Sequence, residues 1–136
     1  MKLSEHFTMD EFIQSDVARK QRIDNTPTYE AAANLALLAT HVLEPARKEY
    51  GKSITISSGY RCTKLNRAVG GVATSQHTKG QAADLVCADL RTLYAIIKRQ
   101  GNFDQLLLEH SKTATWIHVS YNPDGCRCIS NDDYKV

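Results

Sequence analysis

The chain has 136 residues, of which 42% are hydrophobic, and this is enough to form one buried core without disulfide bonds. Its 17 basic and 15 acidic residues give a formal net charge of +2, which is too balanced for the basic surface of a nucleic-acid-binding protein. No apolar run approaches the roughly 20 residues that a membrane span needs, and none follows Lys2 as in a secretory signal. We therefore expect a single domain over residues 1–136 that stays in the cytoplasm as synthesised.

The first half of the chain carries helical patterns. A capping box with Glu11 opens a short predicted helix from Thr8 to about Ser15. A long helix is expected from about Thr28 to Tyr50, because apolar residues recur there at helical spacing. Pro45 lies within it and should kink or locally unwind it.

The second half carries mostly strand patterns, with two further helices between them. The helices are expected at Thr63–Val69 and from Asp89 through Gln100. Runs rich in apolar and β-branched residues predict strands at Ser53–Ser57, Ala82–Cys87, Phe103–Glu109 and Trp116–Tyr121. The last two can pair as a hairpin. Helices first and strands later favour an α+β fold with helices packed on a mostly antiparallel sheet.

The four cysteines do not form a recognisable metal-binding or disulfide framework. Without a secretory signal, free thiols are the expected state of Cys62, Cys87, Cys126 and Cys128. Cys126 and Cys128 lack a second cysteine pair at zinc-finger spacing, so they do not predict a zinc site.

The segment from Ser75 to Asp84, SQHTKGQAAD, is the most informative part of the sequence. It places His77 in a glycine-containing loop and a carboxylate early in the following strand. Zinc accepts imidazole nitrogen and carboxylate oxygen, and a loop that doubles back on its strand can bring both to one point. Asp84 lies among apolar residues, where a carboxylate is costly to bury unless something pairs with it. His118, in the alternating run Trp116–Ser120, is the third candidate ligand.

From these residues alone, metal-free interpretations stay open. A histidine in a strand is often a hydrogen-bonded core residue, and a buried aspartate often caps a turn or pairs with an arginine. One such alternative is a metal-free fold in which Asp84 pairs with Arg61. Three protein ligands with one open position would instead describe a catalytic zinc site.

Three separated motifs resemble one protein family. The pattern S-x-H-x-x-G-x-A-x-D is preceded by Ser57–Arg61 (SSGYR) and followed by Trp116–Ser120 (WIHVS). This order resembles the zinc D-Ala-D-Ala carboxypeptidase family, which includes D-alanyl-D-alanine dipeptidases and phage L-alanyl-D-glutamate endopeptidases. The resemblance extends from Leu3–Phe7 to about Tyr121 and implies a hedgehog/DD-peptidase-like fold. It also implies one zinc ion held by His77, Asp84 and His118.

The resemblance implies further site residues. Arg61 corresponds to the arginine that faces the substrate and the developing oxyanion, so it is expected in both catalysis and substrate binding. Ser75 is expected either to orient a ligand near the substrate or to cap its loop. Many members carry an acidic residue or a histidine shortly before the last ligand, but this chain has Thr115 and Trp116 there. We therefore predict Glu109 as the general base.

Glu109 is chosen because a hairpin could place it opposite His118, where an apolar surrounding would raise its pKa toward the useful range. Asp104 is the reserve candidate for the general base. The other histidines, His6, His41 and His110, fit no ligand position.

The expected function is a zinc metallopeptidase that hydrolyses peptidoglycan stem peptides or muropeptides, as a carboxypeptidase or an endopeptidase. Such a chain can be a phage-type lysin released to the cell wall or a cytosolic muropeptide recycler, and we expect a monomer. The alternative is a non-catalytic zinc-binding module that binds cell-wall or other peptides. Glu109 separates the two, because a binding module has no need of a general base.

Overall fold

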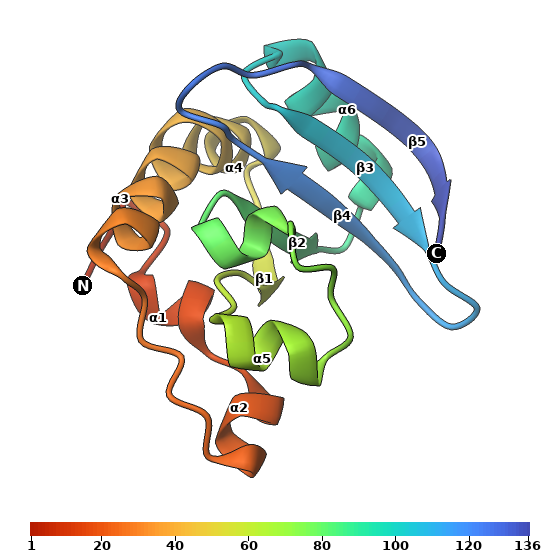
Figure 1. The fold of residues 1–136 in the computed structure, drawn as a ribbon. Coiled ribbons are helices and arrows are strands. Elements are labelled where there is room, and N and C mark those ends of the chain that lie inside the picture. Colours follow the sequence, from red (N-terminus) through yellow and green to blue (C-terminus); the bar gives the residue numbers. More distant parts are fainter.

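A five-stranded sheet runs through the computed structural model, which describes residues 1–136 (Figure 1). The strands are β1 (Thr55–Ser58), β2 (Ala82–Val86), β3 (Gln105–His110), β4 (Thr115–Ser120) and β5 (Ile129–Lys135). They lie in the order β1-β2-β4-β3-β5. Every neighbouring pair is antiparallel except β3 and β5, which are parallel. The predicted α+β fold with a mostly antiparallel sheet is confirmed, and β5 is an unpredicted addition at its edge.

The helices surround this sheet. They are α1 (Met9–Ile13), α2 (Asp16–Gln21), α3 (Tyr29–Leu38), the π-helical turn η1 (Ala39–Leu43), α4 (Glu44–Tyr50), α5 (Thr63–Ala68), the 3₁₀ turn η2 (Gln76–Lys79) and α6 (Leu90–Gln100). Helix α2 and turn η2 were not predicted. No helix has both the length and the apolar character that crossing a membrane requires.

The predicted long helix is present as the consecutive segments α3, η1 and α4. Pro45 has no N–H to donate to the carbonyl of His41, four residues earlier. Asn102 donates its side-chain amide to that carbonyl instead, at 2.9 Å. The helix widens to a π turn over these residues, which is the local disruption expected from the proline.

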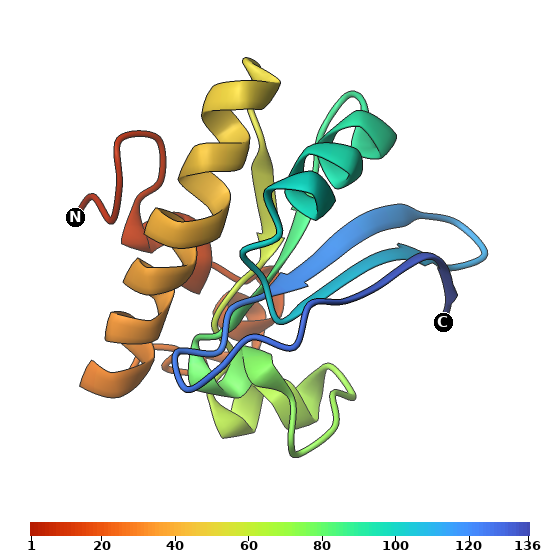
Figure 2. The same cartoon turned by 90° about the horizontal axis from the view of Figure 1, so that it is seen from above.

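One face of the sheet forms the core. The side chains of alternate strand residues, including Leu85, Leu106 and Ile117, are completely covered. Helices α3, α4 and α6 pack over this face (Figure 2). Because side chains alternate along a strand, the intervening residues Asp84 and His118 lie on the other face. The register pairs these two residues directly, so the fold itself brings two predicted ligands together.

Candidate metal centre

His77 lies in turn η2, directly before strand β2. The Ser75 hydroxyl caps this turn by accepting a hydrogen bond from the His77 backbone N–H at 3.2 Å. The His77 ring is buried, and its Nδ1 lies 2.7 Å from the carbonyl oxygen of Gly59. A carbonyl can only accept, so Nδ1 carries the proton and Nε2 keeps its lone pair. That free nitrogen lies 3.4 Å from Oδ1 of Asp84.

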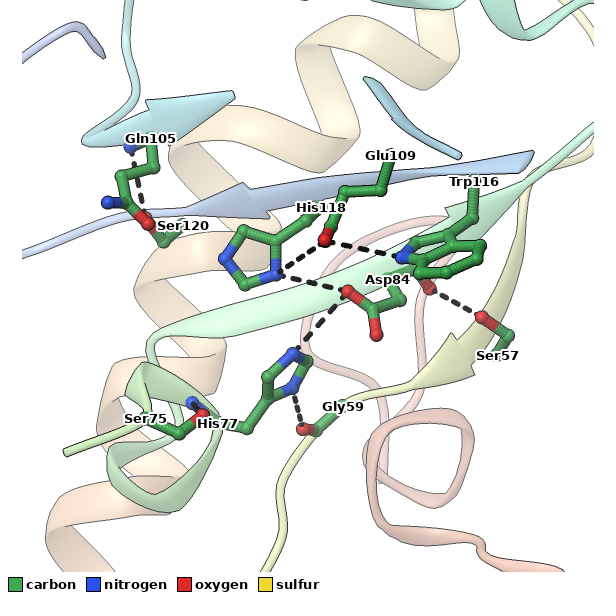
Figure 3. Close-up of polar contacts among 10 residues, drawn as sticks. All are labelled: Ser57, Gly59, Ser75, His77, Asp84, Gln105, Glu109, Trp116, His118 and Ser120. Carbon is green, nitrogen blue, oxygen red and sulfur yellow. Dashed lines mark hydrogen bonds and ion pairs between the residues drawn. The ribbon is translucent and has the colours of Figure 1, made fainter. Parts of the chain in front are cut away.

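Asp84 and His118 complete the group from the adjacent strands β2 and β4. His118 Nδ1 lies 3.1 Å from Asp84 Oδ1, and both side chains are largely buried. Figure 3 shows His77, Asp84 and His118 pointing toward one another from three different segments. One candidate ligand atom from each residue lies within 4.8 Å of the other two.

The spacing and the donor types fit zinc. A tetrahedral ion with bonds of about 2.0–2.1 Å separates its ligand atoms by roughly 3.3 Å. The two ligand separations at Asp84 are 3.1 and 3.4 Å. Two imidazole nitrogens and one carboxylate oxygen leave a fourth position for a small molecule, as in catalytic zinc sites. The Gly59 carbonyl on His77 Nδ1 is the kind of outer contact that orients a ligand.

Asp84 is held as a carboxylate by the two histidines. Burial on its own raises the pKa of Asp84, but its close polar contacts with the imidazoles of His118 and His77 outweigh it and hold the pKa well below its usual range. No ion pair joins Asp84 to Arg61, so the metal-free alternative based on that pair is not the arrangement found.

Glu109 lies next to this group, on strand β3. Its Oε1 is 3.8 Å from His118 Nδ1 and accepts a hydrogen bond from Trp116 Nε1 at 3.3 Å (Figure 3). The register pairs Glu109 with Trp116, so Glu109 reaches His118 diagonally and not from the directly opposed position that we expected. Burial raises the pKa of Glu109, and the nearby charge of Asp84 adds to this effect while His118 opposes it.

Arg61 approaches the same group from the loop after β1. Its backbone N–H donates to the carbonyl of His77 at 3.1 Å, which fixes the loop against turn η2. Its guanidinium is partly buried, and the buried Nε has no hydrogen-bond partner. Burial lowers the pKa of Arg61, against the opposing effect of Asp84. Arg61 therefore keeps donor capacity for an anionic or carbonyl oxygen.

These residues meet in one cleft of about 490 Å³, which we call the catalytic cleft. Its polar lining consists of Arg61, Ser75, His77, Asp84, Glu109, Trp116 and His118. The structure thus brings together every predicted metal, catalytic and substrate-binding residue. Within that set, the Ser75 hydroxyl contacts the backbone of the candidate ligand His77 and not its ring.

Asp104, the reserve candidate for the general base, is elsewhere, and that suggestion is wrong. It is completely buried and accepts hydrogen bonds from the backbone N–H, Nε and Nη2 of Arg127 at 2.8–2.9 Å. Gln76 donates to it as well, at 3.0 Å. Asp104 therefore fastens the segment that precedes β5 to the body of the protein.

The remaining histidines and Cys62 have local contacts outside the ligand set. His6 contacts Glu44, His41 stacks on Tyr121, and His110 contacts Thr115. Cys62 caps helix α5, because its sulfur accepts a hydrogen bond from the backbone N–H three residues later.

Two contributors to the site were missed from the sequence. Gly59 contributes only a backbone carbonyl, which leaves no signal in a side-chain pattern. Trp116 is not a useful proton acceptor, but its indole N–H is a donor that can hold a carboxylate. That donor property is the signal that could have pointed to the Trp116–Glu109 contact.

Two histidines and one carboxylate that leave a position open toward a cleft are typical of the zinc sites of metallopeptidases. A family model described as Peptidase M15 matches residues 5–120, and the chain therefore belongs to the Peptidase M15 family. This family is in general zinc-dependent and acts on peptidoglycan peptides. The resemblance inferred from the three motifs is confirmed. A search of curated proteins found no match.

Proposed function

We propose that this chain is a zinc metallopeptidase that hydrolyses peptide bonds in the stem peptides of peptidoglycan. The observation that carries the proposal is the convergence of His77, Asp84 and His118 in a cleft that also contains Glu109 and Arg61. Membership of the Peptidase M15 family supports the peptidase class independently.

In this proposal, His77 Nε2, Asp84 and His118 Nδ1 hold the zinc ion. When bound, zinc supplies Lewis acidity, which lowers the pKa of water and polarises a carbonyl group. Glu109 takes a proton from the attacking water and returns it to the leaving amine. Its raised pKa suits both steps, because a group that exchanges protons works best near the ambient pH. Trp116 holds Oε1 of Glu109 and so fixes the direction of the carboxylate.

Arg61 supplies positive charge near Asp84 in the same cleft. A guanidinium can stabilise a developing oxyanion or hold a carboxylate of the substrate through paired hydrogen bonds. Stem peptides are rich in carboxylates, and the unpartnered Nε of Arg61 is suited to such a contact. Its backbone N–H, bonded to the carbonyl of His77, anchors the main chain of Arg61 beside the turn that carries a proposed ligand.

The decisive experiment compares the wild type with Glu109→Gln, measuring zinc by elemental analysis and hydrolysis of purified peptidoglycan by mass spectrometry. We expect about one zinc per chain in both proteins and a fall in kcat of roughly 10²–10⁴-fold in the variant. Glu30→Gln, at an exposed position of α3, is the matched control and should keep full activity. A zinc-loaded wild type that cleaves none of a diverse set of stem peptides would instead favour the non-catalytic binding module.

The proposal also includes the place of action. We propose a monomer that acts on the assembled wall, in the manner of a phage-type lysin. Loss of turbidity of isolated cell walls should then be faster than turnover of the same amount of soluble muropeptides. The reverse preference would point to a recycling enzyme.

A further inference from the structure

The turn Val69–Val72 follows helix α5 and lines the catalytic cleft together with Arg61. Asn66, a buried residue of α5, holds this turn in two ways. Its backbone carbonyl accepts a hydrogen bond from the N–H of Gly71 at 2.9 Å, and its side-chain nitrogen donates to the carbonyl of Val72 at 2.8 Å. The backbone of the turn is therefore fixed to the helix, although the Val69 and Val72 side chains are exposed.

The guanidinium of Arg61 needs something to direct it, because the protein gives it no ion pair. None of the ion pairs of the fold includes Arg61, and its buried Nε has no hydrogen-bond partner. A long side chain of this kind has many rotamers, and a rotamer that turns away removes its charge from the substrate. The direction of Arg61 must therefore come from its other neighbours.

Gly71 lies against both Asn66 and Arg61. A Cβ built on Gly71 would be 2.1 Å from Oδ1 of Asn66 and 3.0 Å from Nη1 of Arg61, so these two atoms approach the same point. Any side chain at Gly71 would displace one of them. The carbonyl of Val72 can only accept, so the amide nitrogen of Asn66 faces Val72 and its oxygen is left on the side of Gly71. That oxygen is buried and has no hydrogen-bond partner.

We propose that Asn66 is a positioning residue for Arg61. A buried amide oxygen without a donor attracts a nearby guanidinium, and more strongly in a partly desolvated cleft than in water. Gly71 leaves open the space in which this attraction acts, and the guanidinium is kept turned into the catalytic cleft. The inference rests on the proposed function, in which Arg61 holds a substrate carboxylate or the developing oxyanion. Asn66 acts through Arg61 and does not itself contact the substrate.

The test is a double-mutant cycle on Arg61 and Asn66, with kcat/KM for cleavage of purified stem peptides as the measurement. Arg61→Ala alone should lower kcat/KM by about 10²–10³-fold, because a charge that stabilises the oxyanion is lost. Asn66→Ala alone should lower it by about 10-fold, because the guanidinium is misdirected. In the Arg61→Ala background, Asn66→Ala should cost less than about 2-fold, since the group that it positions is already absent. A residue that only stabilises the turn would cost the same in both backgrounds.

Gly71→Ala tests the same contact while keeping Asn66, and it decides the matter if Asn66→Ala does not fold. Its methyl group has to push Oδ1 of Asn66 and Nη1 of Arg61 apart, so kcat/KM should fall by about 10-fold, and only when Arg61 is present. Lys64→Ala, at an exposed position of α5, is the control and should change kcat/KM in neither background. The Asn66 and Gly71 variants should keep about one zinc per chain, because they leave the proposed ligands in place.

Three results overturn the positioning role alone: equal losses in the two backgrounds, full activity of both Asn66→Ala and Gly71→Ala, or loss of zinc from these variants. A wild type that cleaves no peptide overturns the proposed function together with this inference. An Arg61→Ala protein with full activity overturns the proposed role of Arg61 and, with it, that of Asn66.

Discussion

Two clusters of histidine and carboxylate side chains invite comparison, because both have the composition of a metal site. His77, Asp84 and His118 form one, and Glu5, His6 and Glu44 form the other. In the second cluster, Glu44 accepts from the His6 backbone at 2.7 Å and contacts His6 Nδ1 at 2.6 Å.

The two clusters differ in what surrounds them. The His6 cluster joins the N-terminal segment to α4, with Lys48 as an additional cation 3.5 Å from Glu5. None of its residues lines the catalytic cleft. The His77 cluster instead keeps a nitrogen lone pair available and faces the cleft beside a carboxylate of raised pKa. An available donor and room for a substrate distinguish the two clusters.

The largest predicted difference between the clusters is in metal binding. His77→Ala should reduce bound zinc from about one equivalent to a small fraction and lower peptidase activity by roughly 10³-fold or more, because one of three ligands is lost. His6→Ala should keep both the zinc and the activity. Elemental analysis and peptide hydrolysis measure the two effects. Zinc loss in the His6 variant would show that the second cluster is also a metal site.

A smaller effect is expected from Gly59→Ala. The new methyl group has to displace the backbone of Phe12, which should cost about 1–3 kcal/mol in the free energy of unfolding. The shifted carbonyl would no longer orient His77, so zinc affinity should fall by about 10–100-fold. Thr55→Ala, at an exposed position of β1, the strand that precedes Gly59, should change neither quantity. Normal zinc affinity in a destabilised Gly59→Ala protein would contradict the orienting role.

Trp116→Phe should have a more modest effect on the rate. It keeps an aromatic ring but removes the N–H that holds Glu109, a hydrogen bond worth about 0.5–1.5 kcal/mol. We expect kcat to fall by about 3–10-fold, with KM and zinc content nearly unchanged. Steady-state kinetics give kcat and KM separately, and Tyr121→Phe serves as the aromatic control. A change in KM alone would assign Trp116 to substrate binding.

The smallest effect, confined to acid stability, is predicted for the His6 cluster. Burial on its own raises the pKa of Glu44, but the nearby Ser4 hydroxyl and the hydrogen-bonding contacts of the His6 backbone and ring outweigh it and lower the pKa from 4.5 to about 2. Ionised Glu44 therefore stabilises the fold above pH 4.5, and this contribution is lost as the pH falls toward 2. Glu44→Gln should flatten the decline of the unfolding free energy over this range, as measured by urea unfolding at several pH values. If the unfolding free energy of the variant falls with pH as steeply as that of the wild type, the ionisation of Glu44 does not contribute to stability.

The central strands and the convergence of the candidate ligands were predictable because their signals are local. Alternation in β2 and β4 puts Asp84 and His118 on the face opposite the core, and the structure pairs them as neighbours. The position of Glu109 was predicted only approximately. Its register depends on the length of the hairpin loop, and a shift of one residue changes which side chains face each other.

Other features depend on contacts that no local pattern contains. Strand β5 carries mostly polar residues without alternation and owes its form to backbone pairing with β3. Helix α2 is short, with only Ala18 buried, and its N-cap is Ser15, where the sequence pattern predicts the end of the preceding helix. The role of Asp104 depended on Arg127, which is distant in sequence and arrives only when the C-terminal segment folds back.

Strand β5 has a consequence for self-association. An unpaired outer strand can template the growth of a sheet across molecules, which leads to aggregation. Here that strand carries Asp132 and Lys135 at exposed positions, and both side chains would lose hydration if a second copy paired along it. The late strand therefore completes the sheet and at the same time protects its border against uncontrolled polymerisation.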